Sequence, residues 1–275
     1  MTSFSISASR FAACVVNLDE IAPRCFRLRL QAKFARAPRA GQFVHVLTRG
    51  SEHFDPLLRR AFSIASLDIE SFDIVFRVEG KGTSALSCFL PGTPLDVLGP
   101  LGRPFHISTS PIWLVGGGVG VPPLAMLAQQ ESRARILEPQ SIKTFVGART
   151  SVELLCLDDF ARHEVDIVTA TEDGSAGFHG YVTQILETHL REHLLASGLM
   201  PMVCACGPTP MLSAVAKVCA RFDVACQVSL EESMPCGIGV CNGCVVAMKD
   251  SVDEYGRYQR LCVHGPVMWA HEINW

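Results

Sequence analysis

Residues 111–130, PIWLVGGGVGVPPLAMLAQQ, join a short apolar run to a glycine-rich turn and then to an apolar segment that begins with two prolines. This order predicts a buried strand, a tight turn and a helix, because glycine suits the turn and proline is tolerated where a helix starts. The segment from Gly116 to Pro123 lacks the G-x-G-x-x-G spacing of the usual dinucleotide fingerprint. Backbone N–H groups at such a turn still make an anion site, and a purely structural turn is the alternative.

Downstream of this stretch, strand-like runs alternate with helical segments. The runs are IKTFVGART (142–150), VDIVTATEDG (165–174) and MVCACGPTPMLSAVAKVC (202–219), the last of which continues into a helix. Such alternation predicts a nucleotide-binding α/β domain with a parallel sheet. We predict that this domain spans residues 109–226.

Upstream, the pattern changes to short apolar runs separated by turn residues. The runs are FRLRL (26–30), GQFVHVL (41–47), AFSIASL (61–67), FDIVFRVEG (72–80) and GTPLDVLGPLG (92–102). They predict an antiparallel β-barrel over residues 1–108. Within it, Arg59 and Arg60 precede Ser63 on a predicted strand, and VEGKGTSALS (78–87) is a glycine turn that opens a helix. An arginine fork and the N–H groups beside Thr83 would bind a diphosphate, with solvated arginines as the alternative.

The remaining segment, residues 227–275, contains a cysteine cluster. Cys236, Cys241, Cys244 and Cys262 follow the pattern C-x4-C-x2-C, then seventeen residues and a last cysteine. The first three match plant-type [2Fe–2S] spacing, and the glycines between them allow backbone N–H groups to approach sulfur. A zinc site is the alternative, although structural zinc usually takes two separate short ligand pairs. We predict a small C-terminal [2Fe–2S] cluster module.

Most other cysteines lie scattered in apolar contexts, which predicts inert buried thiols. They are Cys14, Cys25, Cys88, Cys156, Cys204, Cys219 and Cys226.

Composition excludes several classes of function. The net charge is −3 and no Lys/Arg block occurs, which argues against nucleic-acid or membrane-surface binding. The first twenty residues lack the features of a signal peptide, and glycines and prolines interrupt the longest apolar run. We expect a cytoplasmic protein.

The order of these motifs resembles the ferredoxin–NADP reductase superfamily, whose members share R-x-x-S, then G-G-x-G-x-x-P, then C-G-P. With the C-terminal motif SLEESMPCGIGVCNGC (229–244) and the later LCVHGPV (261–267), the resemblance narrows to the electron-transfer subunits of NAD-dependent (type B) dihydroorotate dehydrogenase. It covers nearly the whole chain, from about residue 11 to Trp275.

The resemblance implies bound FAD and a pyridine nucleotide lying against it. The implied flavin-binding residues are Arg60, Ala61, Phe62, Ser63, Val75, Phe76, Arg77, Gly82 and Thr83. The implied nucleotide-binding residues are Gly117, Gly118, Gly120, Pro123, Cys206, Gly207 and Pro208. The superfamily often has tyrosine where this chain has Phe62, so no phenolic hydrogen bond is expected there. The resemblance places Cys206 near the reacting ring carbon. The alternative is that Cys206 is only a buried thiol. We assign no catalytic base.

The two strand ends VGART and VTATEDG offer Arg149, Glu172 and Asp173. Acidic side chains repel the 2′-phosphate of NADP and can accept a hydrogen bond from the ribose hydroxyl of NAD, so we predict NAD as the nucleotide. The alternative is that these side chains face solvent and do not select the nucleotide.

The resemblance further implies electron flow from dihydroorotate to FMN in a separate catalytic subunit, then through the cluster and FAD of this chain to NAD⁺. The partners would form a heterotetramer, contacting the small and apolar loop residues Met234, Pro235, Ile238 and Val240. Three alternatives remain: a subunit of an NAD(P)H-linked ferredoxin or sulfide-type oxidoreductase, a freestanding oxygenase reductase, and a non-enzymatic zinc-binding module.

Overall fold

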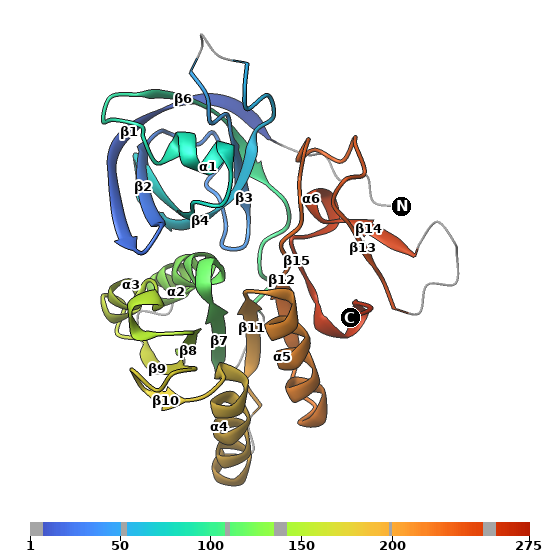
Figure 1. The fold of residues 1–275 in the computed structure, drawn as a ribbon. Coiled ribbons are helices and arrows are strands. Elements are labelled where there is room, and N and C mark those ends of the chain that lie inside the picture. Colours follow the sequence, from blue (N-terminus) through green and yellow to red (C-terminus); the bar gives the residue numbers. More distant parts are fainter. Residues whose placement is uncertain (1–7, 51–53, 108–110, 135–141, 198–199, 250–256) are drawn as a thin grey trace.

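The computed structural model describes residues 8–50, 54–107, 111–134, 142–197, 200–249 and 257–275. They form a β-barrel, an α/β domain below it and a small module beside both (Figure 1). In these ranges, no helix is both long and apolar enough to cross a membrane. The predicted fold class is confirmed.

Six antiparallel strands close the barrel in the spatial order β1-β2-β5-β4-β3-β6. They are β1 (Ser9–Ala22), β2 (Cys25–Gln31), β3 (Phe43–Val46), β4 (Arg60–Leu67), β5 (Ser71–Arg77) and β6 (Pro94–Leu101). Alternate side chains such as Leu28, Leu30, Val44 and Val46 are fully buried, as strand periodicity requires. Helix α1 (Lys81–Leu86) follows β5 and lies over one end of the barrel.

Seven strands form the second sheet in the order β10-β9-β8-β7-β11-β12-β15. They are β7 (Ile112–Gly117), β8 (Ile142–Ala148), β9 (Asp166–Thr171), β10 (Phe178–His179), β11 (Met202–Cys206), β12 (Cys226–Ser229) and β15 (Val267–Trp269). Neighbours are parallel except β15, which pairs antiparallel with β12. Because β15 comes from the C-terminal module, this pairing joins that module to the α/β domain.

Helices cover both faces of this sheet. They are α2 (Val121–Ala134), α3 (Leu157–Ala161), α4 (Val182–Ser197) and α5 (Thr209–Arg221), with short 3₁₀ turns η1 (Gly118–Gly120) and η3 (Ser151–Glu153). Along β7, Ile112 and Leu114 share one core with α2 and the barrel, whereas Trp113 and Val115 share the other with α4 and α5. Helix α2 therefore lies between the sheet and the barrel.

The C-terminal module consists of a two-stranded ribbon, β13 (Val245–Ala247) and β14 (Tyr258–Arg260), followed by α6 (Leu261–His264), β15 and the 3₁₀ turn η4 (Ala270–Glu272). Strand β12 runs across residues 226 and 227, where the sequence places a domain boundary.

The prediction of buried thiols is wrong for two cysteines. Cys25, Cys156, Cys204, Cys219 and Cys226 are buried, whereas Cys14 is half-buried and Cys88 is exposed. Cys88 lies in the surface turn just after α1, between Leu86, which is fully buried, and Leu90, which is 72% exposed.

Candidate active site

A cavity of about 250 Å³ lies where the three parts of the chain meet. All but two of the residues expected to bind flavin line it, namely Ala61, Phe62, Ser63, Val75, Phe76, Arg77 and Thr83. These residues come from neighbouring parts of β4, β5 and α1, so barrel topology gathers them from two separate sequence segments.

The remaining two residues expected to bind flavin, Arg60 and Gly82, lie against each other. A Cβ at Gly82 would stand 2.9 Å from Arg60 Nε and 3.1 Å from the buried hydroxyl of Thr48. Arg59 is engaged elsewhere, since its Nη1 donates to the Asp96 carbonyl at 2.7 Å and its Nη2 to the Asp96 carboxylate. Arg60 Nη1 in turn donates to the Leu58 carbonyl at 2.7 Å, so both arginines have partners, but only Arg60 lies against the Gly82 turn.

The two segments predicted to bind the nucleotide meet at Gly120. A Cβ there would come within 2.4 Å of the Cys206 carbonyl carbon and of the Gly207 nitrogen. Similarly, a Cβ at Gly117 would stand 2.8 Å from Met211 Sδ. Two backbone segments about 90 residues apart in sequence are thus in contact only because no side chain separates them.

The other residues predicted to bind the nucleotide are each positioned by their own turn or helix end. Gly118 has φ +54°, a left-handed conformation that favours glycine. Pro123 is buried in the first turn of α2, and Pro208 precedes α5. Val119, between two of the glycines, lines the cavity.

Cys206 ends β11 and is almost completely buried. Burial raises the pKa of its thiol, and the charge of Glu231 adds to the effect. The thiol is therefore neutral at physiological pH, suited to packing against a ring and unsuited to act as a nucleophile.

Glu172 and Asp173, the acids predicted to favour NAD over NADP, lie together just after β9, at the edge of the sheet where its parallel strands end. Glu172 N donates to the Ala148 carbonyl at 3.1 Å and Asp173 N to the Arg149 carbonyl at 3.2 Å, which joins the ends of β8 and β9. Arg149 Nε lies 3.4 Å from Glu153 Oε2, and Asp173 Oδ1 accepts a hydrogen bond from Ser175 N at 2.9 Å. Glu172 is exposed at this edge.

The four cluster cysteines are brought together in two pairs. The thiol of Cys236 interacts with that of Cys241, and the thiol of Cys262 with that of Cys244. Backbone N–H groups approach the sulfurs: Gly243 N lies 3.4 Å from Cys241 Sγ, and Cys262 N lies 3.5 Å from Cys244 Sγ. In the described ranges, no three Cys, His, Asp or Glu side chains surround a single ion position.

This arrangement fits a two-iron cluster, in which each iron takes two thiolates. Burial alone would raise the pKa of Cys236, but backbone N–H groups of Cys241, Ile238 and Val240 lower it to about 6. That favours the thiolate that iron requires. Gly237 and Gly239 have φ +69° and +83°, so the loop bends in a way that side chains would oppose.

The third wall of the cavity was missing from the sequence prediction. It consists of residues that lead into or follow the cluster loop, namely Ser229, Leu230, Glu231, Glu232, Met234 and Pro266. Glu231 is open to the cavity yet surrounded by protein, and burial together with the charge of Glu79 raises the pKa of its carboxyl. The only sequence signal was the position of SLEE immediately before the cluster motif.

The fold and the paired cysteines define an oxidoreductase of the ferredoxin reductase type with an appended iron–sulfur module. Two family models match the chain: the iron-sulfur cluster binding domain of dihydroorotate dehydrogenase B at residues 231–274, and the oxidoreductase NAD-binding domain at residues 114–217. These matches favour iron–sulfur over zinc, and with the fold they support the predicted set of FAD, a [2Fe–2S] cluster and NAD.

Curated relatives match over almost their whole length. The dihydroorotate dehydrogenase B (NAD(+)) electron transfer subunit of Desulforamulus reducens is 35% identical over 96% of this chain and 98% of its own. The corresponding subunit of Bacillus caldolyticus is 38% identical over 92% and 94%. The chain belongs to the family of dihydroorotate dehydrogenase B electron transfer subunits.

Solved structures share the fold. An NADH-dependent reduced ferredoxin–NADP oxidoreductase chain, studied for flavin-based electron bifurcation, has a TM-score of 0.80 at 28% identity, covering 100% of this chain and 92% of its own. The ferredoxin reductase in carbazole 1,9a-dioxygenase has a TM-score of 0.65 at 22% identity, covering 80% and 68%, and supports the fold alone.

Proposed function

We propose that this chain passes electrons from the FMN of a dihydroorotate-oxidising catalytic subunit, through its own [2Fe–2S] cluster and FAD, to NAD⁺. The observation that carries the proposal is the three-walled cavity. Its walls are Ala61 to Ser63 of the barrel, Val119 of the nucleotide loop, and Glu231 with Met234 beside the cluster loop. A ring held there touches the nucleotide-binding segment on one side and the cluster module on the other.

The protein's own residues would bind and orient the cofactors. Arg60 and the Gly82–Thr83 turn would hold the FAD diphosphate, and Phe62, Val75 and Phe76 would exclude water from the ring. Cys236, Cys241, Cys244 and Cys262 would hold the cluster. When bound, FAD supplies the exchange between single electrons and a hydride. No protein group needs to act as a base, which agrees with the neutral Cys206 thiol.

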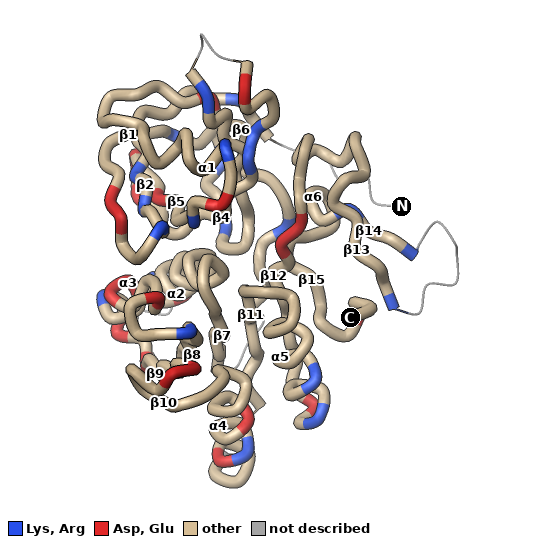
Figure 2. The backbone as a smooth tube through the Cα atoms, viewed as in Figure 1, with Lys and Arg blue, Asp and Glu red and all other residues tan. Residues whose placement is uncertain are grey.

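The surface around the cluster loop suits a protein partner. Residues 233–248 contain no charged side chain, and this stretch of the tube is accordingly tan in Figure 2. Ile238, Val240 and Val245 are exposed by 41%, 75% and 41%. An uncharged, partly apolar surface next to the cluster favours close approach by another protein. We place the FMN subunit here, in a cytoplasmic heterotetramer.

The test compares the chain alone with the reconstituted complex. Alone, it should reduce artificial acceptors with NADH and fail to oxidise dihydroorotate. Addition of the FMN subunit should confer NAD⁺-dependent dihydroorotate oxidation. Oxidation of dihydroorotate by the isolated chain, or no gain when the partner is added, would reject the proposal.

A second candidate is a subunit of an NAD(P)H-linked ferredoxin oxidoreductase, favoured by the TM-score of 0.80 with such a chain. Here the electron carrier would be a small iron–sulfur protein in place of an FMN subunit. NADH-dependent reduction of purified ferredoxin at a rate exceeding dihydroorotate-linked turnover would support this candidate.

A further inference from the structure

His45 lies on the outer side of the barrel, where the barrel meets the cluster module. Its strand neighbours Val44 and Val46 point into the barrel core, whereas Phe43 belongs to the core that also contains Cys244 and Cys262. His45 has no exposed surface. A polar ring is therefore fully enclosed between β3 and the cluster module.

The ring packs directly on the turn that follows the first cluster cysteine. A Cβ at Gly237 would stand 2.7 Å from Cε1, 2.8 Å from Nε2 and 2.9 Å from Nδ1 of His45. Such similar distances to three ring atoms mean that the Gly237 backbone lies over the face of the ring. The two ring nitrogens, at the edge, are thus left to bond elsewhere.

Neither nitrogen has a hydrogen-bond partner among the residues that the structure describes. The Met234 backbone lies beside the ring, but it forms no hydrogen bond of acceptable distance and angle. An imidazole carries at least one N–H in every protonation state. Because buried polar groups almost always have a partner, this N–H requires an acceptor beyond those that the described residues place at hydrogen-bonding geometry.

His45 also lies next to the flavin cavity. It pairs with Ala61 across β3 and β4, and its ring centroid is 5.8 Å from that of Phe43. Both Ala61 and Phe43 line the cavity. His45 is thus a single residue that contacts the cavity wall on one side and the cluster loop on the other.

We propose that His45 is a positioning residue for the iron–sulfur cluster: its ring supports the Gly237 turn, and its N–H donates to a sulfur atom of the cluster or of its cysteine ligands. The proposal rests on the proposed function, because it requires the cluster. The acceptor follows from chemistry: cluster assembly brings sulfide and thiolate sulfurs to the loop against which the ring packs.

Such a hydrogen bond should change the reduction potential of the cluster in a definite direction. Reduction adds negative charge to the cluster, so a donor to sulfur stabilises the reduced form more than the oxidised form. His45 should accordingly raise the potential of the cluster and favour its acceptance of an electron from the partner.

The experiment measures iron, sulfide and the cluster midpoint potential, by EPR-monitored redox titration, in the full chain with its cofactors. His45→Phe keeps a ring of similar size without an N–H and should lower the midpoint potential at unchanged iron content. His45→Gln retains a donor and should shift it less. His189→Phe is the matched control, since His189 packs on Trp113 and Phe145 in the α/β domain, and should cause no shift.

A second measurement keeps the proposal falsifiable if His45→Phe loses its cluster. Pulsed EPR of the reduced wild-type chain with ¹⁵N-labelled histidine should show a nitrogen coupling that disappears in His45→Gln. A wild-type midpoint in fully loaded His45→Phe, or no such coupling in the wild type, overturns the role of His45 alone. Zinc or no iron in the wild-type chain overturns the proposed function itself.

Discussion

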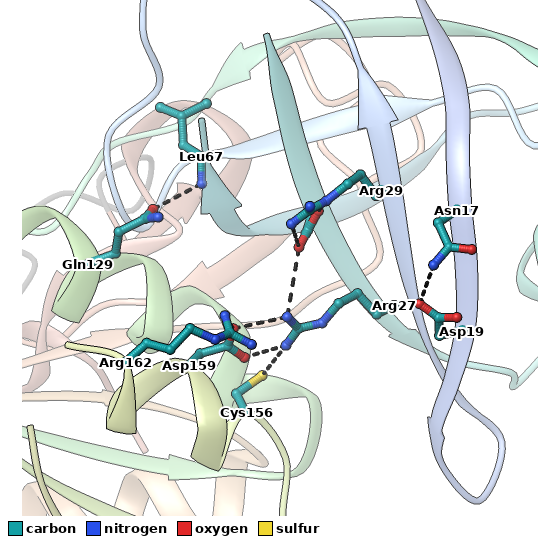
Figure 3. Close-up of polar contacts among 10 residues, drawn as sticks. Asn17, Asp19, Arg27, Arg29, Leu67, Gln129, Cys156, Asp159 and Arg162 are labelled. Atoms are coloured by element: carbon teal, nitrogen blue, oxygen red, sulfur yellow. Dashed lines mark hydrogen bonds and ion pairs between the residues drawn. The ribbon is translucent and has the colours of Figure 1, made fainter. Parts of the chain in front are cut away.

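Arg27 on β2 and Asp159 in α3 form a paired hydrogen bond and ion pair that joins the barrel to the α/β domain (Figure 3). Arg27 Nη1 lies 2.9 Å from Asp159 Oδ1, and Arg27 Nη2 contacts both Asp159 Oδ2 and the Cys156 thiol, at 3.6 Å from the latter. The side chains are 19% and 8% exposed. Because the cavity lies between these same two domains, the pair contributes to their relative orientation.

Asp159→Asn should destabilise the protein by about 2 kcal/mol, since it removes the charged hydrogen-bond partner of the largely buried Arg27 and leaves it only the Asp73 carboxylate, 3.8 Å from Arg27 Nη1. Arg162→Met is the control: Arg162 contacts the same carboxylate at 2.9 Å but is 64% exposed, so its loss should cost less than about 1 kcal/mol. Urea unfolding monitored by circular dichroism gives both values. Equal effects of the two variants would contradict a special role for Arg27.

The cost of Asp159→Asn should depend on pH. Burial by itself would raise the pKa of Asp159, but the hydrogen bond and charge of Arg27 outweigh it and lower the pKa below 3.8. A lowered folded-state pKa means that the stabilisation is present above that ordinary value and is lost as the pH falls through the folded-state pKa. The difference in unfolding free energy between the wild type and Asp159→Asn should be constant from pH 7 to 5 and decrease below about pH 4. A constant difference down to pH 3 would contradict this assignment.

Cys241→Ala should abolish the cluster, because one iron would lose one of its two thiolates. Iron and acid-labile sulfide should fall to near zero, and the visible absorption due to the cluster should disappear while FAD absorption remains. Cys88→Ala, at an exposed cysteine away from the loop, should retain both. Stoichiometric zinc in anaerobically prepared wild-type chain would refute the cluster assignment.

Local patterns were sufficient to predict the barrel, the parallel sheet and an iron–sulfur module, with the four cysteines as its predicted ligands. The alternation around Val44 and Val46 and the spacing of Cys236, Cys241 and Cys244 are properties of contiguous sequence, so they need no knowledge of packing. Helix α4 also has a local signal, because Val182, Leu186 and Leu190 recur at the spacing of one helix face and are buried.

Long-range contacts were beyond sequence patterns. Gln129 sits in an otherwise apolar helix face, and only the structure shows that its Oε1 accepts from Leu67 N of the barrel at 3.0 Å (Figure 3). Likewise, nothing local indicates that β15 joins the parallel sheet or that Glu231 and Met234 form a wall of the cavity. Such contacts depend on where domains dock, which the sequence of one segment does not encode.

Arg60→Ala should weaken FAD retention about tenfold or more, because a charge-assisted pair with phosphate is worth roughly 1.5–3 kcal/mol. Arg36→Ala, at an exposed arginine before β3, should bind FAD as the wild type does. Equilibrium dialysis with flavin fluorescence measures both dissociation constants. The assignment fails if the released flavin is FMN or if Arg60→Ala retains FAD as tightly as the wild type.

Gly120→Ala should impair use of NADH without loss of FAD. The added Cβ would meet the Cys206 and Gly207 backbone at 2.4 Å and force apart the two segments predicted to bind the nucleotide. Gly118→Ala is the comparison, since a Cβ there meets nothing within 4 Å and carries only the strain of φ +54°, on the order of 1 kcal/mol. Steady-state assays with an artificial acceptor should show a much larger fall in kcat/KM for Gly120→Ala. Similar falls in both variants would argue against the close approach.

NADH should be preferred over NADPH, with Glu172 as the residue that opposes the 2′-phosphate. Of the two acids at this edge, Asp173 is already engaged by Ser175, whose backbone N and hydroxyl donate to it at 2.9 and 2.6 Å, whereas Glu172 is exposed beside it. Removing a like charge near the phosphate should favour NADPH, so Glu172→Gln should raise kcat/KM for NADPH severalfold and change that for NADH little. Asp173→Asn should have the smaller effect on the NADPH value, because its turn with Ser175 holds it in place. Diaphorase assays with both nucleotides measure the ratio; a wild-type preference for NADPH, or a ratio unmoved by Glu172→Gln, would show that these acids do not select the nucleotide.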